Sequence, residues 1–306
     1  MVCNMFEVSQ LARQSELRTD SQQIEAFWRG EHSLTLLWQD GHFLMQGNQP
    51  RYFSYQQIQP IKQGLDDAVY LGSFEGKFYF ACQIKQAGLD FAESEMLSLR
   101  SASTKVVELD MEIMFYAQGL LNWLRNHAFC SRCGHDTEII EAGHARRCNN
   151  AQCAKTAYPK IDSAVIFSVI NNTGPESKIL LGRKSVWDEN RYSVIAGFVE
   201  PGEMLEDAVR REAYEETGVK VYGVQYMGSQ PWPFPDALML GFSAQTSDHE
   251  ITLVDNELEH AAWFTANEME TALRQGKLKM PFAISIAWCL IDHWFQAQKG
   301  YSIKSI

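Results

Sequence analysis

Three glutamates lie close together in a segment whose pattern predicts a helix, and their side chains are suited to binding a metal ion. Glu212, Glu215 and Glu216 are spaced i, i+3 and i+4, so a helix brings the three carboxylates together. Like charges at this spacing repel each other, and partial burial adds a desolvation cost unless a cation compensates. Mg²⁺ or Mn²⁺ is such a cation, and Mg²⁺ bound by a few carboxylates also binds substrate phosphate oxygens. The pattern therefore indicates metal-dependent chemistry at phosphorus, with a metal-bound water as nucleophile.

The apolar residues of the same segment argue against a solvated acidic surface. Leu205, Ala208 and Val209 share the face of the three glutamates, so the packing stripe of the helix runs into the carboxylates. We expect the solvent side to consist of Glu206, Asp207, Arg210 and Thr217. Gly197 and Gly202 permit a tight loop before the helix, and Gly218 is suited to end it.

Four cysteines in the middle of the chain predict a second metal site. They form two pairs, with the spacings C-x2-C and C-x4-C, separated by fourteen residues: Cys130, Cys133, Cys148 and Cys153. Two tight turns of this kind present four thiolates to one tetrahedral Zn²⁺, and a fully ligated site of this kind is structural. Two disulfides, or a ribbon that has lost its metal, are the alternatives. The remaining cysteines are scattered and are expected to be ordinary thiols: Cys3, Cys82 and Cys289.

Composition limits the classes of partner. The 306 residues carry a net charge of −11 and are 45% hydrophobic, which allows a sizeable core but argues against general affinity for nucleic acid or anionic membranes. The first twenty residues lack a signal-peptide pattern, and no stretch approaches the apolar length of a membrane span. We therefore expect a cytoplasmic protein that does not bind membranes.

The elements that must position these residues fall into three parts. Residues 1–126 predict an N-terminal α+β domain, with strands at 32–38, 68–74 and 77–84 and helices at 93–102 and 109–127. Residues 127–160 form the cysteine-bearing ribbon. Residues 161–306 predict an α/β domain with a mixed sheet, in which the acidic helix 205–218 and an apolar helix at 284–295 are set among strands.

The segment from 197 to 219 resembles the signature of the Nudix hydrolases, G-x5-E-x7-R-E-U-x-E-E-x-G-U. The match is carried by Gly197, Glu203, Arg211, Glu212, Glu215, Glu216, Gly218 and Val219. Ala213 departs from the bulkier aliphatic residue of the pattern, which affects packing more than chemistry.

Two further features resemble the NADH pyrophosphatase branch of that family. One is the run SQPWPFP at 229–235, whose prolines stiffen the backbone. The other is the zinc clip, preceded by the pattern A-x5-W-x3-H-x-F-C that begins at Ala117. The resemblance implies a Nudix α/β/α sandwich with a mixed sheet, preceded by a zinc ribbon and a β-rich N-terminal domain, and assembled as a homodimer.

The resemblance also implies roles for individual residues. The metal ligands would be Glu212, Glu215 and Glu216, joined by Glu257 and the Ala196 carbonyl. Glu203 would orient Arg211, and Phe198 would stack on the nicotinamide ring. Further residues are placed near the dinucleotide substrate: Gln230, Trp232, Tyr158, Ser285 and Ala287.

The implied reaction is metal-dependent hydrolysis of NADH or NAD⁺ to nicotinamide mononucleotide and AMP, which makes NAD-capped RNA a further substrate. Departures at Ser163, Ala237 and 280–282 affect substrate handling, so ADP-ribose, FAD and dinucleoside polyphosphates stay open as alternatives. A nucleotide sensor that does not cut its ligand is disfavoured because every glutamate of the signature is present. A zinc-ribbon module for nucleic acid is disfavoured by the net negative charge.

Overall fold

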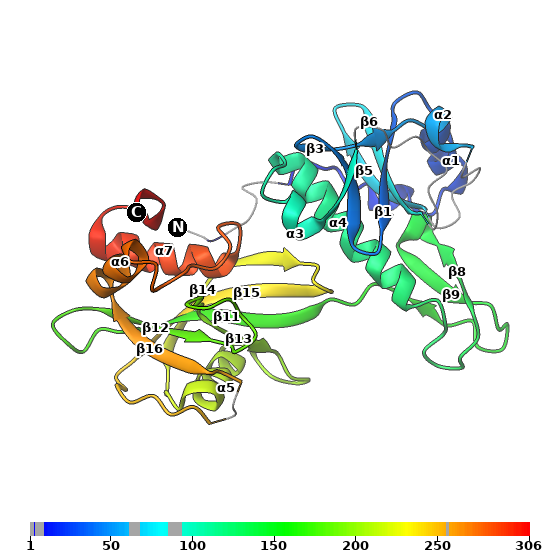
Figure 1. The fold of residues 1–306 in the computed structure, drawn as a ribbon. Coiled ribbons are helices and arrows are strands. Elements are labelled where there is room, and N and C mark those ends of the chain that lie inside the picture. Colours follow the sequence, from blue (N-terminus) through cyan, green and yellow to red (C-terminus); the bar gives the residue numbers. More distant parts are fainter. Residues whose placement is uncertain (1–2, 4–8, 61–67, 85–93, 255–256) are drawn as a thin grey trace. The chain divides into compact units, whose positions relative to one another are not determined.

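The computed structural model describes residues 3, 9–60, 68–84, 94–254 and 257–306. The chain divides into two compact units (Figure 1). One consists of residues 1–5, 162–232 and 237–306, and the other of residues 6–161 and 233–236. Each unit is described by itself below.

A six-stranded sheet forms the centre of the first unit. Its strand order is β14-β15-β11-β12-β16, and β13 pairs with β11. Because β11 runs parallel to β15 and antiparallel to β12 and β13, the sheet is mixed, as predicted. The strands are β11 (Asp162–Asn171), β12 (Lys178–Arg183), β13 (Ile195–Phe198), β14 (Tyr222–Trp232), β15 (Ala237–Thr246) and β16 (His260–Thr265).

Helices cover both faces of this sheet, with α5 on one side and α6 and α7 on the other (Figure 1). Strand β11 shows why, because its side chains alternate between two cores. Val165, Phe167 and Val169 join the core under α5, whereas Ile166 and Ile170 pack with α7. The predicted α/β/α sandwich is thereby confirmed. The helices are α5 (Leu205–Thr217), α6 (Ala266–Arg274), α7 (Ile286–Lys299) and the short 3₁₀ turn η3 (Ile303–Ser305).

Helix α5 buries Ala208, Val209 and Ala213 against the sheet. It ends at Gly218, whose φ of 71° is a left-handed conformation that glycine adopts without strain. The prediction that Thr217 faces solvent was wrong, because its side chain is fully buried and its hydroxyl donates to the Ala213 carbonyl. This bond to the carbonyl four residues earlier makes the buried hydroxyl tolerable.

The second unit is built on a seven-stranded sheet in which β1 and β6 run parallel. The strands predicted at 32–38, 68–74 and 77–84 and the helix predicted at 109–127 are all present. The strands are β1 (Ser33–Gln39), β2 (His42–Gln46), β3 (Gln49–Pro50), β4 (Tyr52–Phe53), β5 (Ala68–Phe74), β6 (Lys77–Gln83) and β7 (Glu95–Ser98). The helices are η1 (Ser15–Leu17), α1 (Ser21–Arg29), α2 (Tyr55–Ile58), α3 (Leu99–Ala102) and α4 (Glu108–Asn126).

One predicted helix of this unit was wrong over most of its length. The first residue of the predicted segment 93–102, Glu93, lies outside the described residues. Strand β7 occupies 95–98 and pairs antiparallel with β2, with Met96 opposite Leu44. Only α3, which follows β7, is helical. The free edge of β2 offers backbone hydrogen bonds that outweigh the local helical pattern.

The cysteine-bearing segment forms a small three-stranded sheet of order β10-β9-β8. Its elements are β8 (Thr137–Ile140), the turn η2 (Glu141–Gly143), β9 (Ala145–Cys148) and β10 (Thr156–Ala157). Within the described part of the chain, no helix combines the length and apolar character that crossing a membrane requires.

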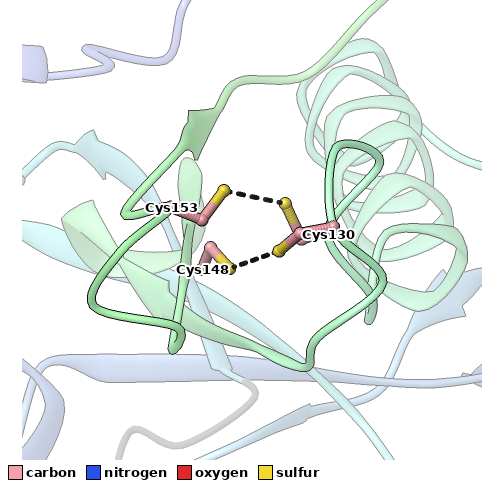
Figure 2. A group of neighbouring side chains, drawn as sticks. Cys130, Cys148 and Cys153 are labelled. Atoms are coloured by element: carbon pink, nitrogen blue, oxygen red, sulfur yellow. Dashed lines mark hydrogen bonds between the residues drawn. The ribbon is translucent and has the colours of Figure 1, made fainter.

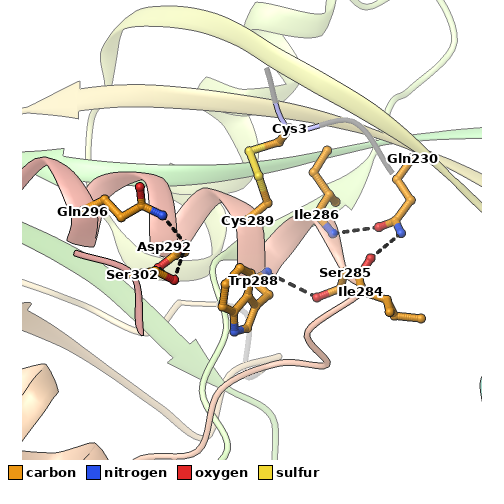
Figure 3. The surroundings of a disulfide bond; sticks show 10 residues. All are labelled: Cys3, Gln230, Ile284, Ser285, Ile286, Trp288, Cys289, Asp292, Gln296 and Ser302. Atoms are coloured by element: carbon orange, nitrogen blue, oxygen red, sulfur yellow. Dashed lines mark hydrogen bonds between the residues drawn. A yellow bond between two sulfur atoms is a disulfide. The ribbon is translucent and has the colours of Figure 1, made fainter. Parts of the chain in front are cut away.

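Cys3 and Cys289 form a disulfide that joins the start of the chain to helix α7 (Figure 3). The prediction that both are ordinary thiols was wrong. The pair is separated by 286 residues in the sequence, so only the tertiary structure reveals that they meet. The Cys3 amide also donates to the Met227 carbonyl of β14 at 2.7 Å, which fixes Cys3 beside the sheet.

Candidate active site and zinc centre

The three glutamates of α5 differ in their exposure. Glu216 is 1% exposed, and the side chain of Glu212 is 14% exposed. The side chain of Glu215 is 50% exposed, so the expectation that all three lie on the packed side was wrong for this residue. Residue 215 is rotated by about 300° from residue 212 about the helix axis, which turns the Glu215 side chain toward the edge of the packed face.

Arg211 connects these glutamates to the loop that precedes α5. Its Nε and Nη2 donate to the two carboxylate oxygens of Glu203 at 2.8 and 2.9 Å. Its Nη1 donates to Glu212 at 2.8 Å and to Glu215 at 2.9 Å. The remaining bond runs from Nη2 to the Phe198 carbonyl at 2.9 Å. One guanidinium therefore holds three carboxylates and the end of β13 in fixed positions.

Electrostatics distinguish the carboxylates that Arg211 contacts. Hydrogen bonds from Arg211 lower the pKa of Glu203, which keeps that carboxylate ionised. Burial raises the pKa of Glu212, and the charges of Glu215 and Glu257 raise it further, while Arg211 opposes the shift. The guanidinium itself has a raised pKa, chiefly through its bonds to Glu203. The region around Glu212 therefore carries more negative charge than one arginine neutralises.

Strand β13 brings its backbone against the acidic helix. Gly197 lies so close to Glu212 that a Cβ at this position would be 1.9 Å from the Glu212 carboxyl carbon. Ala196 pairs with Ile166 of β11, which fixes the backbone of β13 beside the carboxylates. The next residue, Phe198, has a side chain that is 61% exposed. Its ring is thus available for contact with a ligand.

Glu257 comes just before β16 and lies near the same cluster, since its charge acts on Glu212. Its carboxylate forms an ion pair with Lys184 at 2.8 Å. Sequence reasoning missed Lys184, because a single lysine after a strand carries no signal of its own. The pairing depends on the strand order, in which β12 and β16 are neighbours.

Gln230 has a different position from the one expected of a pocket residue. It is 1% exposed. Its amide nitrogen donates to the Ile284 carbonyl at 2.8 Å, and its amide oxygen accepts from the Ile286 amide at 2.7 Å (Figure 3). Both atoms thereby hold the start of α7, where Ser285 caps the helix by accepting from the Trp288 amide.

The other residues expected near a dinucleotide are spread over both units. Ala287 is buried in the first turn of α7, and Trp232 ends β14 opposite Ala237. Tyr158 belongs to the second unit, where it is 51% exposed and donates to Glu141 at 3.3 Å.

The donor set around α5 fits a hard divalent cation. Oxygen ligands from carboxylates and a backbone carbonyl are what Mg²⁺ and Mn²⁺ prefer. The carboxylates of buried Glu216 and largely buried Glu212 are stabilised most by such an ion, because burial is costly for an uncompensated carboxylate. The close approach of Gly197 to Glu212 brings the β13 backbone into the same place.

The four predicted cysteines meet in one cluster, and Figure 2 labels three of them, Cys130, Cys148 and Cys153. The sulfurs of Cys130, Cys133, Cys148 and Cys153 all lie within 4.8 Å of one another. The Cys130 and Cys153 sulfurs are 3.8 Å apart, and those of Cys133 and Cys148 are 3.4 Å apart. A zinc ion with Zn–S bonds of about 2.3 Å requires sulfur separations of about 3.8 Å, so the cluster has the size of a zinc site.

Backbone amides support thiolates in this cluster. The Arg132 amide donates to the Cys130 sulfur at 3.4 Å. A backbone hydrogen bond from His135 lowers the pKa of Cys133 to about 6. Burial acts in the other direction on Cys148 and raises its pKa to about 12. A bound cation stabilises all four thiolates together.

Comparison with protein families gives three matches along the chain. The NUDIX domain model matches residues 159–282. The NADH pyrophosphatase zinc ribbon domain matches residues 125–156, which include the four cysteines. The NADH pyrophosphatase-like rudimentary NUDIX domain matches residues 31–123.

Curated relatives agree with these matches. The NAD-capped RNA hydrolase NudC of Mycobacterium bovis is 34% identical over 295 residues, which cover 92% of this chain and 91% of that protein. The NAD-capped RNA hydrolase NUDT12 of Homo sapiens is 40% identical over 204 residues, covering 64% of this chain and 44% of that protein. The chain thus spans less than half the length of the human relative. A solved NUDIX hydrolase from Nitrosomonas europaea is 19% identical, with a TM-score of 0.44, over 57% of this chain and 93% of its own.

Proposed function

We propose that this chain, which belongs to the Nudix hydrolase family and to its NADH pyrophosphatase branch, hydrolyses the pyrophosphate bond of NADH and NAD⁺. The products are nicotinamide mononucleotide and AMP. The observation that carries this proposal is the arrangement around Arg211, which holds Glu203, Glu212 and Glu215 beside buried Glu216. Such a concentration of carboxylates suits a reaction in which cations and a diphosphate meet.

The proposed ligands of the catalytic cations are carboxylates and one carbonyl: Glu212, Glu215, Glu216, Glu257 and the Ala196 carbonyl. When bound there, Mg²⁺ or Mn²⁺ lowers the pKa of a water molecule and neutralises charge that develops on the phosphate oxygens. Glu216 is the residue on which we place most weight, because its carboxylate is the most deeply buried of the three on α5.

The contribution of Arg211 is to position the carboxylates. Its two hydrogen bonds to Glu203 anchor the guanidinium to the loop before α5. Hydrogen bonds from its Nη1 limit the rotation of the Glu212 and Glu215 side chains. Preorganised carboxylates need no rearrangement when the substrate arrives, which lowers the barrier to reaction.

Further residues are proposed for substrate binding from the family resemblance. Phe198 presents an exposed ring at the end of β13, where we propose that it stacks on the nicotinamide ring. Gln230 positions Ser285 and Ala287 at the start of α7, because its amide is bonded on both sides of Ser285. Trp232 at the end of β14 is a further candidate in this unit, and Tyr158 of the second unit is proposed from the resemblance alone.

The same reaction would remove an NAD cap from RNA, because the cap contains the same diphosphate. The relatives that are named NAD-capped RNA hydrolases support this extension. We further propose one structural Zn²⁺ per chain at the cysteine cluster, a homodimeric assembly and a cytoplasmic location. The zinc proposal is supported by the match to the zinc ribbon and by the distances between the four sulfurs.

Product analysis by mass spectrometry tests the reaction. The purified protein with Mg²⁺ or Mn²⁺ is given NADH, NAD⁺, ADP-ribose and diadenosine polyphosphates in separate reactions. We expect nicotinamide mononucleotide and AMP from NADH, and a loss of at least about a hundredfold in rate for Glu216→Gln. Glu206→Gln changes an exposed glutamate of the same helix and serves as the control. Much slower cleavage of NADH than of ADP-ribose would overturn the substrate assignment.

A further inference from the structure

The ion pair between Lys184 and Glu257 connects the proposed metal site to a lysine that the family signature does not contain. We propose that Lys184 holds the Glu257 carboxylate while the site lacks cations, and that its ammonium group then binds the substrate diphosphate once cations take the carboxylate. Lys184 is thus a substrate-binding residue that exchanges one anionic partner for another. This inference rests on the proposed pyrophosphate hydrolysis.

The strand pairing places the two residues together. Strands β12 and β16 pair as far as Arg183 opposite His260, and the Glu259 amide donates to the Arg183 carbonyl at 2.9 Å. Lys184 is the first residue after β12, and Glu257 lies just before β16. Their contact of 2.8 Å therefore closes this end of the two-strand ladder.

The neighbouring residue Leu258 fixes this end of the ladder against the acidic helix. Leu258 is 5% exposed and belongs to the same core cluster as Val209 and Ala213 of α5 and Ile195 of β13. Glu257, one residue earlier, is near enough for its charge to raise the pKa of Glu212. The lysine ammonium therefore lies at the rim of the carboxylate cluster.

Two other cations at this end of β12 have acidic partners outside the proposed ligand set. Arg183 pairs with Glu259 at 3.0 Å, and Arg191 pairs with Asp188 at 2.6 Å. Binding of divalent ions leaves those pairs in place. Lys184 differs from both, because it contacts a carboxylate that we assign to the ions.

The exchange follows from charge balance. A divalent ion and an ammonium group compete for one carboxylate, and the ion gains more from it at short range. The ammonium carries three donors on a flexible stem, so the donor that leaves Glu257 is available to the oxygens of a diphosphate. The side chain of Lys184 is 34% exposed, so solvent does not fully screen its charge.

The exchange predicts that a single variant binds Mn²⁺ more tightly but has a higher KM for NADH. Lys184→Met removes the competitor for Glu257, so Mn²⁺ should bind about two- to fivefold more tightly in the absence of nucleotide. The same variant loses a charged contact to the substrate, so the KM for NADH should rise at least about tenfold with kcat little changed. Lys184→Arg keeps the charge and should restore the KM to within about threefold of wild type.

Electron paramagnetic resonance of free Mn²⁺ measures metal affinity independently of turnover, and steady-state kinetics with NADH measure the KM. Lys178→Met is the matched control, since Lys178 is at the opposite end of β12. Tighter Mn²⁺ binding together with a raised KM supports the exchange. Weaker or unchanged Mn²⁺ binding, or a KM equal to that of Lys178→Met, overturns it. If the wild-type protein does not cleave NADH, the proposed function itself fails, which is a separate outcome.

Discussion

Arg211 and Glu203 are joined by two parallel hydrogen bonds of 2.8 and 2.9 Å, which orient the whole guanidinium plane. Because that plane also meets Glu212 and Glu215, the loop before α5 determines where the acidic side chains of α5 lie. The proposed chemistry therefore depends on a residue that need not touch the substrate.

Replacing Arg211 with lysine should lower kcat for NADH by at least about tenfold, because a single ammonium cannot make the paired bonds to Glu203 while holding two more carboxylates. Steady-state kinetics measure the effect. Arg210→Lys, which alters the exposed pair with Asp207, should leave kcat near wild type. Equal effects of the two substitutions would contradict the positioning role of Arg211.

Gly197→Ala should impair the site through contact with one carboxylate. The added methyl would be 1.9 Å from the Glu212 carboxyl carbon, so either β13 or the glutamate must move. We expect a loss of about a hundredfold in kcat/KM and of about 1 to 3 kcal/mol in the free energy of unfolding. Kinetics and urea unfolding measure both. At Gly174 an added Cβ would meet only the Glu176 carbonyl oxygen, at an ordinary contact distance of 3.9 Å, so Gly174→Ala should change neither quantity appreciably.

The stability of the second unit should depend on pH through His144. This residue is 5% exposed, its Nε2 contacts the Tyr70 carbonyl at 2.7 Å, and burial lowers its pKa to about 4. The unfolded chain binds a proton below about pH 6.5, whereas the folded chain does so only near pH 4. The contribution of neutral His144 to the free energy of unfolding is therefore complete above pH 6.5. It is lost as the pH falls from 6.5 to 4, by up to about 3 kcal/mol.

Urea unfolding at pH 7.5 and pH 5 checks this dependence. His144→Gln removes the titrating group and should reduce the difference between the two pH values. His32→Gln, an exposed histidine of the same unit, should retain it. Identical pH dependence in all three proteins would refute the assignment to His144.

The cysteine cluster should hold about one zinc ion per chain, as elemental analysis of the purified protein can measure. Cys148→Ala should lose most of the zinc and raise amide hydrogen exchange across 130–157, because the metal would tie the two cysteine-bearing turns together. Cys82→Ala removes a buried cysteine elsewhere in the same unit and should keep the zinc. Retention of full zinc content by Cys148→Ala would be inconsistent with a four-cysteine site.

Elements with strong local patterns could be predicted from the sequence. Helix α5, several strands of each sheet and the cysteine cluster all depend on spacing within short segments, and the structure contains them. The roles of the proposed catalytic and substrate-binding residues stay predictions. The contacts of Arg211 with Glu203, Glu212 and Glu215 make the catalytic predictions specific enough to test.

Features that depend on distant segments could not be predicted. Strand β7 forms because β2 offers an edge some fifty residues earlier in the chain. Cys3 and Cys289 are separated by 286 residues in the sequence and meet only in the tertiary structure. Lys184 acquires its partner through the neighbouring positions of β12 and β16. The burial of Thr217 is a local exception: its hydroxyl bonds to the Ala213 carbonyl within the helix, so it tolerates a buried position that its polarity does not predict.

The central claim is that divalent cations bind among the carboxylates of α5 and there meet the diphosphate of the substrate. Anomalous diffraction from crystals containing Mn²⁺ tests it most directly. We predict manganese peaks within coordination distance of the Glu212 and Glu216 carboxylates. Crystals of an active protein with no manganese at these side chains would contradict the account.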